Sequence, residues 1–300
     1  RLYYGGPMRK LGFAAICGAV LIWGPTYVAT KIALVELGPY LVGFLRSVVA
    51  LLLLGPILIT SFGELKGQKL PFGRLLLMGL TGGAGYFAFQ NLSLLYITAF
   101  EASLIGAMLP VVVAVVSWLV LGEKLTKVQV GGVFLAVIGV VFMSVLGNAA
   151  VETSFSLIGY LLLLGSALAW ALFTILGRRV NAILAPTVVT AFNALFGAAF
   201  LLPLAMLDLV GSGWPQVSPL TWAMVAYLGL AGSGLAFLLW NYGLKTVSAG
   251  EAGTVTNLGP FLGAYFAWTF LGEPITWAHL VGGGIVVAGV MLVSRGGVDE

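Results

Sequence analysis

Polar and aromatic side chains in the middle of long apolar runs are the residues of this sequence best suited to binding chemistry. Burying polarity among apolar residues costs free energy unless the group faces a cavity or a partner. Such rings and amides can stack on small molecules and hydrogen-bond to them. The pattern therefore predicts a central cavity and a pathway for a small-molecule substrate. Its candidate lining residues are Trp23, Tyr27, Arg46, Tyr86, Gln90, Asn91, Trp170, Phe173, Asn193, Phe237, Trp240, Asn241 and Asn257.

The spacing of these residues supports a shared surface. Trp23 and Tyr27 lie four residues apart, which puts both on one face of a helix, and Tyr86 and Gln90 repeat that spacing. For Asn91 a second interpretation stays open, because a buried amide can instead bond two helices together. The same holds for Asn241.

Arg46 is the only charged residue deep within an apolar run, and no carboxylate in the middle of a run is available to pair with it. Two roles stay open. The guanidinium can bond backbone carbonyls or extend toward the membrane surface, or it can attract the carboxylate of a substrate.

Three prolines interrupt the runs near the same depth as these residues. Pro25, Pro110 and Pro260 each have small residues beside them, which is typical of hinges and close helix packing rather than of ligand contacts. We expect these prolines to be hinges.

Several classes of chemistry are excluded by what the chain lacks. It has no phosphate-binding loop of the ATPase type, and its ten acidic residues all sit in loops, tails or the first turn of a run. One histidine and one cysteine make a metal site or a Cys/His nucleophile implausible. We therefore expect no enzyme activity, no cofactor and no metal, and transport by facilitated diffusion or exchange rather than by proton coupling.

The elements that position these residues follow from composition. Hydrophobic residues make up 60% of the chain and charged residues only 8%, which is typical of a membrane protein. A spanning helix needs about 20 apolar residues. We expect an all-α integral membrane protein with ten transmembrane helices, at 11–31, 39–60, 75–97, 102–121, 128–146, 157–177, 186–207, 220–244, 252–271 and 276–294.

The basic residues predict the orientation of these helices. With both termini in the cytoplasm, twelve lysines and arginines fall in inner segments, and Lys31 alone falls in an outer loop. Positive residues favour the cytoplasmic side. The net charge of only +4, spread over short loops, gives no reason to expect a nucleic-acid partner.

An internal repeat accompanies this pattern. A shift of 150 residues aligns 79–144 with 229–294 at 21 identical positions of 66, and a shift of 147 pairs Trp23 with Trp170. Five helices per copy is an odd number, so the two five-helix repeats must be inverted, as in many secondary transporters. We expect residues 1–7 to be left over from expression, 8–150 to form the first repeat and 151–300 the second.

The segment Trp23-Gly24-Pro25-Thr26-Tyr27, the pair Pro39 and Arg46, and Pro110 followed by Trp118 and Leu121-Gly122-Glu123 resemble the EamA-type drug/metabolite transporter superfamily. The last group recurs as Pro260, Trp268 and Leu271-Gly272-Glu273. The overall sequence is similar to the bacterial aromatic amino-acid exporters of that superfamily. The resemblance implies a ten-helix carrier of the bacterial inner membrane, with a cavity between the halves and helices 5 and 10 packed at the side.

The second copy departs from the first where it lacks the Gly-Pro after Trp170 and has Asn193 in place of Arg46. We therefore do not expect the two halves to act as equivalent gates for the substrate.

The leading hypothesis is a secondary transporter that exports aromatic or other neutral amino acids and related metabolites by alternating access. An exchanger of sugar phosphates or nucleotide sugars is the alternative, although such anions favour several cationic residues and only Arg46 and Lys31 are available. A sensor or assembly scaffold is a further alternative. The expected partners are the small-molecule substrate and membrane lipid, and the sequence is compatible with a monomer.

Overall fold

The structure is a computed structural model that describes residues 7–65, 70–122, 124–150, 156–210, 213–243, 247, 255–256 and 258–295. Every element of regular secondary structure within these ranges is a helix. The expectation of an all-α fold is confirmed for this part of the chain.

Most helices of the first half are shorter than a membrane span, because the chain breaks or bends within the long apolar runs. They are α1 (Pro7–Trp23), α2 (Thr26–Ala33), α3 (Pro39–Leu65), α4 (Phe72–Met78), the π-helix η1 (Gly79–Gly85), α5 (Tyr86–Ser93), α6 (Ala99–Gly106), α7 (Leu109–Leu121) and α8 (Lys127–Ala150).

Within the described residues, the second half follows the same order. Its helices are α9 (Leu157–Val180), α10 (Pro186–Leu209), α11 (Pro219–Ala226), the π-helix η2 (Tyr227–Leu235), α12 (Ala236–Gly243), α14 (Gly259–Leu271) and α15 (Trp277–Arg295).

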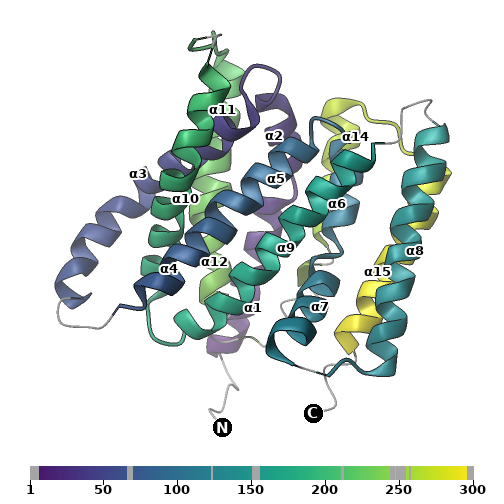
Figure 1. Cartoon of the computed structure of the whole chain (residues 1–300), viewed down its shortest axis with the longest axis horizontal. Helices are drawn as coiled ribbons and strands as arrows, with labels where there is room; N and C mark the ends of the chain where they lie inside the picture. Colours follow the sequence, from purple (N-terminus) through teal and green to yellow (C-terminus); the bar gives the residue numbers. More distant parts are fainter. Residues whose placement is uncertain are drawn as a thin grey trace.

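Seven helical stretches of the described residues are long and apolar enough to cross a membrane, and α6 with α7 gives an eighth. The predicted span at 75–97 overlaps the α4–η1–α5 stretch, whereas 252–271 lies only partly within the described residues. The chain is thus a multi-pass membrane protein. α1 begins and α15 ends at the same end of the molecule (Figure 1).

The three prolines predicted as hinges lie at helix breaks or starts. Pro25 separates α1 from α2, and Pro110 and Pro260 occupy the first turns of α7 and α14. Proline is accepted in a first turn because its missing N–H has no intrahelical partner there. The break before Pro110 bends α6 against α7 by 47°.

The two π-helices occupy corresponding places in the halves and allow close helix contacts. Gly83 of η1 meets the backbone of α10, since a Cβ atom there would lie 2.7 Å from the Cα atom of Gly197. Gly229 of η2 meets α3 in the same way, with the carbonyl oxygen of Arg46 2.9 Å from the corresponding position. The wide π-turns therefore dock each half against a long helix of the other.

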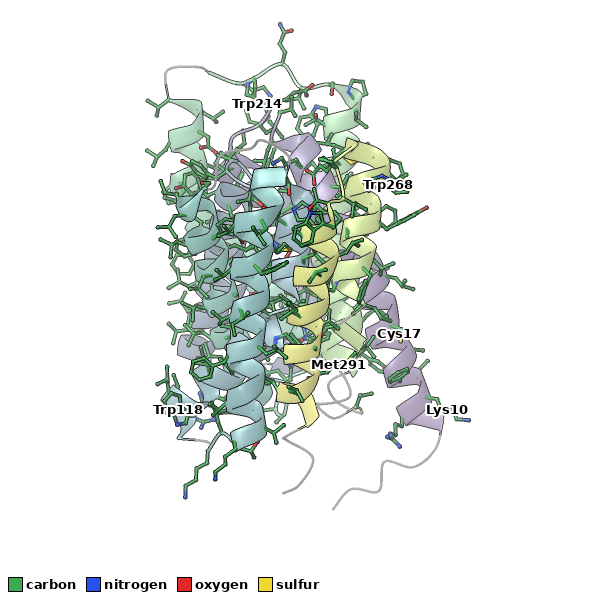
Figure 2. The ribbon with its side chains drawn as sticks, turned by 90° about the vertical axis from the view of Figure 1, so that its right-hand side faces the viewer. Lys10, Cys17, Trp118, Trp214, Trp268 and Met291 are labelled. Carbon is green, nitrogen blue, oxygen red and sulfur yellow. The ribbon has the colours of Figure 1, made fainter. Side chains whose placement is uncertain are left out.

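Repeat-related residues lie at opposite ends of the molecule. Trp118, in α7, is close to the end that carries Lys10, whereas Trp268, in α14, is close to the end that carries Trp214 (Figure 2). Both indoles are about half exposed, as for residues that anchor a helix at a membrane surface. We refer to these two ends as the Lys10 end and the Trp214 end.

Helices α8 and α15 pack side by side at one edge of the molecule (Figures 1 and 2). Their crossing is lined by glycines, with Gly132 against Gly289 and Gly139 against Gly282. Because glycine has no side chain, the two backbones can come into contact here. Small residues at such crossings are typical of helix association within a membrane. The side location of these helices agrees with what the resemblance implies for helices 5 and 10.

Gly139→Ala should lower the stability of this pair. The new Cβ atom would lie 2.7 Å from the backbone nitrogen of Val286, so the helices must separate, at about 1–3 kcal/mol. Gly131→Ala is the matched control on the same helix, because nothing lies within 4 Å of its Cβ position. Thermal denaturation in detergent should show a lower melting temperature for Gly139→Ala only. Equal melting temperatures for the two variants would contradict the close packing.

Candidate functional site

Seven aromatic rings from both halves meet in the interior. Trp23, at the end of α1, lies 5.6 Å from Trp170 of α9, 5.6 Å from Phe237 and 5.5 Å from Trp240 of α12, measured between ring centroids. Tyr86, Phe87 and Phe173 extend the group. We call these residues the ring cluster: Trp23, Tyr86, Phe87, Trp170, Phe173, Phe237 and Trp240.

The rings of the cluster pack edge to face or tilted against one another, and most of them are buried. Trp170 is 7% exposed and Phe237 only 2%. Two of its contacts join residues that the repeat makes equivalent, because Trp23 lies against Trp170 and Phe87 lies 6.3 Å from Phe237. Residues far apart in sequence are therefore brought to the place where the two halves meet. Phe87 was not among the site residues predicted from the sequence. The repeat could have indicated it, because the equivalent position of the second copy is the predicted site residue Phe237.

Hydrogen bonds fix the orientation of the first indole. The Nε1–H group of Trp23 donates to the carbonyl oxygen of Gly232 in η2 at 3.0 Å. The Tyr227 hydroxyl of η2 donates to the carbonyl oxygen of Ile22. A buried indole N–H needs a hydrogen-bond acceptor. Here the π-helix of the second half supplies it.

Arg46 of α3 lies next to the ring cluster and is 2% exposed. Its Nε donates to the Ser233 hydroxyl at 2.9 Å, and its Cζ atom lies 3.8 Å from the centroid of the Phe87 ring. Its Nη1 is buried without a hydrogen-bond partner. The guanidinium is thus held inside the protein rather than at a membrane surface. Ser233 was missed in the sequence, where it is a lone hydroxyl in a glycine-rich run.

Tyr27 and Gln90 lie beside the ring cluster through Tyr86. The Gln90 amide donates to the Tyr86 hydroxyl at 2.9 Å. The Tyr27 hydroxyl interacts with both of these side chains and lies against Gly106 at the bend between α6 and α7. These three residues therefore form a polar edge of the ring cluster.

The two repeat-related asparagines bond helices together. The Asn91 amide donates to the Pro39 carbonyl oxygen at 2.8 Å, and the Asn241 amide donates to the Thr190 hydroxyl at 3.0 Å. Asn241 also accepts from the Asn181 amide. These contacts favour the helix-bonding interpretation for Asn241.

The other predicted site residues are distributed differently. Asn193 is buried in α10, and its Oδ1 has no hydrogen-bond partner. Asn257 lies outside the described residues. Pro25 directly follows Gly24 and Trp23 in the chain, whereas Pro110 and Pro260 lie at the starts of α7 and α14.

At the Trp214 end, charged side chains close the ends of neighbouring helices. Lys31 Nζ donates to the carbonyl oxygens of Leu94 and Ile97 after α5. The carboxylate of Glu273 accepts from the backbone N–H groups of Ala99 and Phe100 at the start of α6, at 2.9 and 2.7 Å. These long-range caps were not predicted, because sequence spacing gives no sign of them.

Two more carboxylates do the same at other helix starts. Asp208 accepts from the Leu41 N–H of α3, and Glu36 from the Ser218 N–H before α11. The Ser218 hydrogen bond lowers the pKa of the Glu36 carboxyl. Anionic side chains also favour the positive end of the helix dipole.

His279 is part of a local cap as well. Its Nδ1 accepts the Thr276 N–H at the start of α15, and Gln129 accepts the Thr126 N–H at the repeat-related start of α8. The matching pair indicates a structural use of this histidine.

Several helical stretches are long enough to cross a membrane, and they surround the ring cluster. The chain is therefore a multi-pass membrane protein, and the ring cluster is its candidate small-molecule site. The EamA-like transporter family matches residues 10–145 and again residues 157–295, and the chain belongs to that family. The chain is therefore a transporter and not an enzyme.

Relatives match over nearly the whole chain. An uncharacterized transporter of Archaeoglobus fulgidus is 31% identical over 92% of this chain and 94% of its own length. The uncharacterized transporter YetK of Bacillus subtilis is 26% identical over 95% and 87%. A protein of Streptantibioticus cattleyicolor named "probable terminal-alkyne amino-acid exporter" is 27% identical over 94% and 92%. A crystal structure with 24% identity superimposes with a TM-score of 0.63 over 95% of both chains and supports the fold.

Substitution of Glu273 should destabilise the protein in graded steps. Glu273→Ala removes both acceptors at the start of α6 and should cost about 2 kcal/mol, whereas Glu273→Gln keeps one neutral acceptor and should cost about half of that. Melting temperatures in detergent should fall in the order wild type, Gln, Ala. A Gln variant as unstable as the Ala variant would mean that the charge, not the hydrogen bonds, matters here.

Proposed function

We propose that this transporter exports amino acids with aromatic or other neutral side chains, and related metabolites, from the cytoplasm. The observation that carries the proposal is the ring cluster at the meeting of the two halves, with one buried cation beside it. Such a site offers an apolar surface for a side chain and a charged group for the polar end of a substrate. The amino-acid exporter among the relatives supports this substrate class.

Sugar phosphates and nucleotide sugars are the alternative cargo. A phosphate group needs several cationic or polar donors. Arg46 is one such donor, but Lys31 is engaged with the carbonyl oxygens of Leu94 and Ile97. One available guanidinium among aromatic rings suits a carboxylate better than a phosphate.

The proposed architecture is ten transmembrane helices in two inverted five-helix repeats, 8–150 and 151–300. Trp118 and Trp268 at opposite ends support inversion, and the contact of Trp23 with Trp170 fits an axis between the halves. The two consecutive family matches fit a division near residue 150. Inverted halves provide alternating access when they exchange conformations.

The pathway in this proposal runs past the ring cluster, with Tyr27, Gln90 and Arg46 beside it. Asn91, Asn193 and Asn257 are further pathway residues of the proposal, whereas Asn241 bonds helices. Pro25, Pro110 and Pro260 would act as hinges, because each lies where a helix starts or breaks and so where little backbone hydrogen bonding resists bending. The proposed location is the bacterial inner membrane.

Both termini are proposed to face the cytoplasm, so the Lys10 end is the inner end. With Cys17 replaced by serine, Lys124→Cys should be protected from a membrane-impermeant maleimide in intact cells and labelled in inverted vesicles. Gln216→Cys, an exposed position near Trp214, should behave in the opposite way. Labelling of Lys124→Cys from outside would reverse the orientation.

A panel of labelled amino acids in proteoliposomes tests function and coupling together. Counterflow at symmetrical pH should be seen for phenylalanine or another neutral amino acid, and a gradient of one pH unit alone should drive no accumulation, because the pathway offers rings, amides and a guanidinium that stays charged. Uphill accumulation that His279→Gln abolishes would show proton coupling. Exchange of glucose 6-phosphate without any amino-acid flux would replace the proposed cargo by the alternative.

A further inference from the structure

We propose that Arg46 is the anchor for the substrate carboxylate, so that the site selects small carboxylates with an apolar or aromatic tail. The proposal rests on the transport function above but concerns one residue and one functional group. Its basis is the buried, incompletely bonded guanidinium, not the family.

The guanidinium has an open donor in a defined position. Nε is used by Ser233, and one face of the planar group is covered by the Phe87 ring at 3.8 Å. Nη1 has no hydrogen-bond partner, although the side chain is only 2% exposed. Ser233 and Phe87 therefore fix the plane of the fork, while its Nη1 group keeps a donor without a partner.

The described part of the chain provides no anion for this cation. The acidic side chains whose contacts are described each bond backbone N–H groups elsewhere: Glu36 at Ser218, Glu101 at Thr98, Asp208 at Leu41, and Glu273 at Ala99 and Phe100. A buried charge without a counterion is strongly disfavoured. An entering carboxylate would supply the missing charge and accept from the fork, which is the geometry that a guanidinium binds best.

The environment also indicates what the rest of the ligand is. Phe87 covers one face of Arg46 and lies near Phe237. Phe237 in turn packs against the indoles of Trp23 and Trp170. A carboxylate held at Nη1 would leave the attached group facing aromatic carbon. This arrangement suits the side chains of phenylalanine or leucine and disfavours a second charge.

The repeat gives this anchor no counterpart. Asn193 occupies the position of Arg46, and Gly83 occupies the position of Ser233. The backbone carbonyl oxygen of Asn193 lies 2.5 Å from where a Cβ atom of Gly83 would be, so no side chain fits there. A single, off-axis anchor would hold the substrate in one orientation in both access states.

Three probes that share one ring separate the carboxylate from the amine: phenylalanine, 3-phenylpropionate and phenylethylamine. Binding is measured on purified protein as the ligand-induced shift in melting temperature, which does not require flux. Phenylalanine and 3-phenylpropionate should stabilise the wild type, and phenylethylamine should not. Arg46→Gln should raise the Kd of both carboxylates about tenfold or more. Arg46→Lys keeps the charge but loses the fork, so its Kd values should lie between those of the wild type and Arg46→Gln.

Arg74→Gln is the matched control, since Arg74 is an exposed arginine at the start of α4 and should bind like the wild type. If Arg46→Gln does not fold, Arg46→Lys and Ser233→Ala, which frees the fork to turn, give the same comparison. Equal stabilisation by phenylethylamine, an unchanged Kd in the Arg46 variants, or no stabilisation by either carboxylate would overturn the proposal. Carboxylate binding without flux of any amino acid would instead overturn the proposed export of amino acids and leave the anchor in place.

Discussion

The structure depends on one constraint, that every backbone polar group in hydrocarbon must find its partner within the protein. Helices that cross without interruption meet this requirement alone, but this chain breaks several of its helices within the apolar runs. The exposed ends are then bonded by side chains from other segments, as Lys31 does for the carbonyl oxygens of Leu94 and Ile97. Side chains from distant segments therefore satisfy the backbone groups that these helix ends leave unpaired.

The two halves meet this constraint with similar geometry and different atoms. Asn91 reaches the Pro39 carbonyl directly, next to Gly43, which has no side chain in the way. In the second half Thr190 stands at the position of Gly43, and Asn241 reaches the equivalent Pro186 carbonyl through the Thr190 hydroxyl. Repeats can therefore keep a helix arrangement while the polar chemistry inside them diverges, as Arg46 and Asn193 also do.

Much of the local structure was predictable from sequence. Apolar runs of about 20 residues gave the helices, and the prolines marked breaks and starts, because both follow from short-range physics. The rings of Trp23, Trp170, Phe237 and Trp240 were recognisable as a set from their depth in the runs. Contacts between distant segments were not, and so the bond from Trp23 to Gly232 and the cap by Glu273 were missed. The π-turns were missed too, since the glycines that permit them also fit an ordinary helix.

The presence of Arg46 in one repeat only, with Asn193 at the equivalent position of the other, has a kinetic consequence. A carrier whose inner and outer faces are not equivalent can present different half-saturation concentrations to the two compartments, because its empty form favours one orientation. Detailed balance nevertheless requires that, for passive movement of a substrate without net charge, kcat/KM be equal in the two directions. The asymmetry of Arg46 and Asn193 can thus tune the concentration at which transport saturates, whereas in passive transport the substrate gradient decides the direction of net movement.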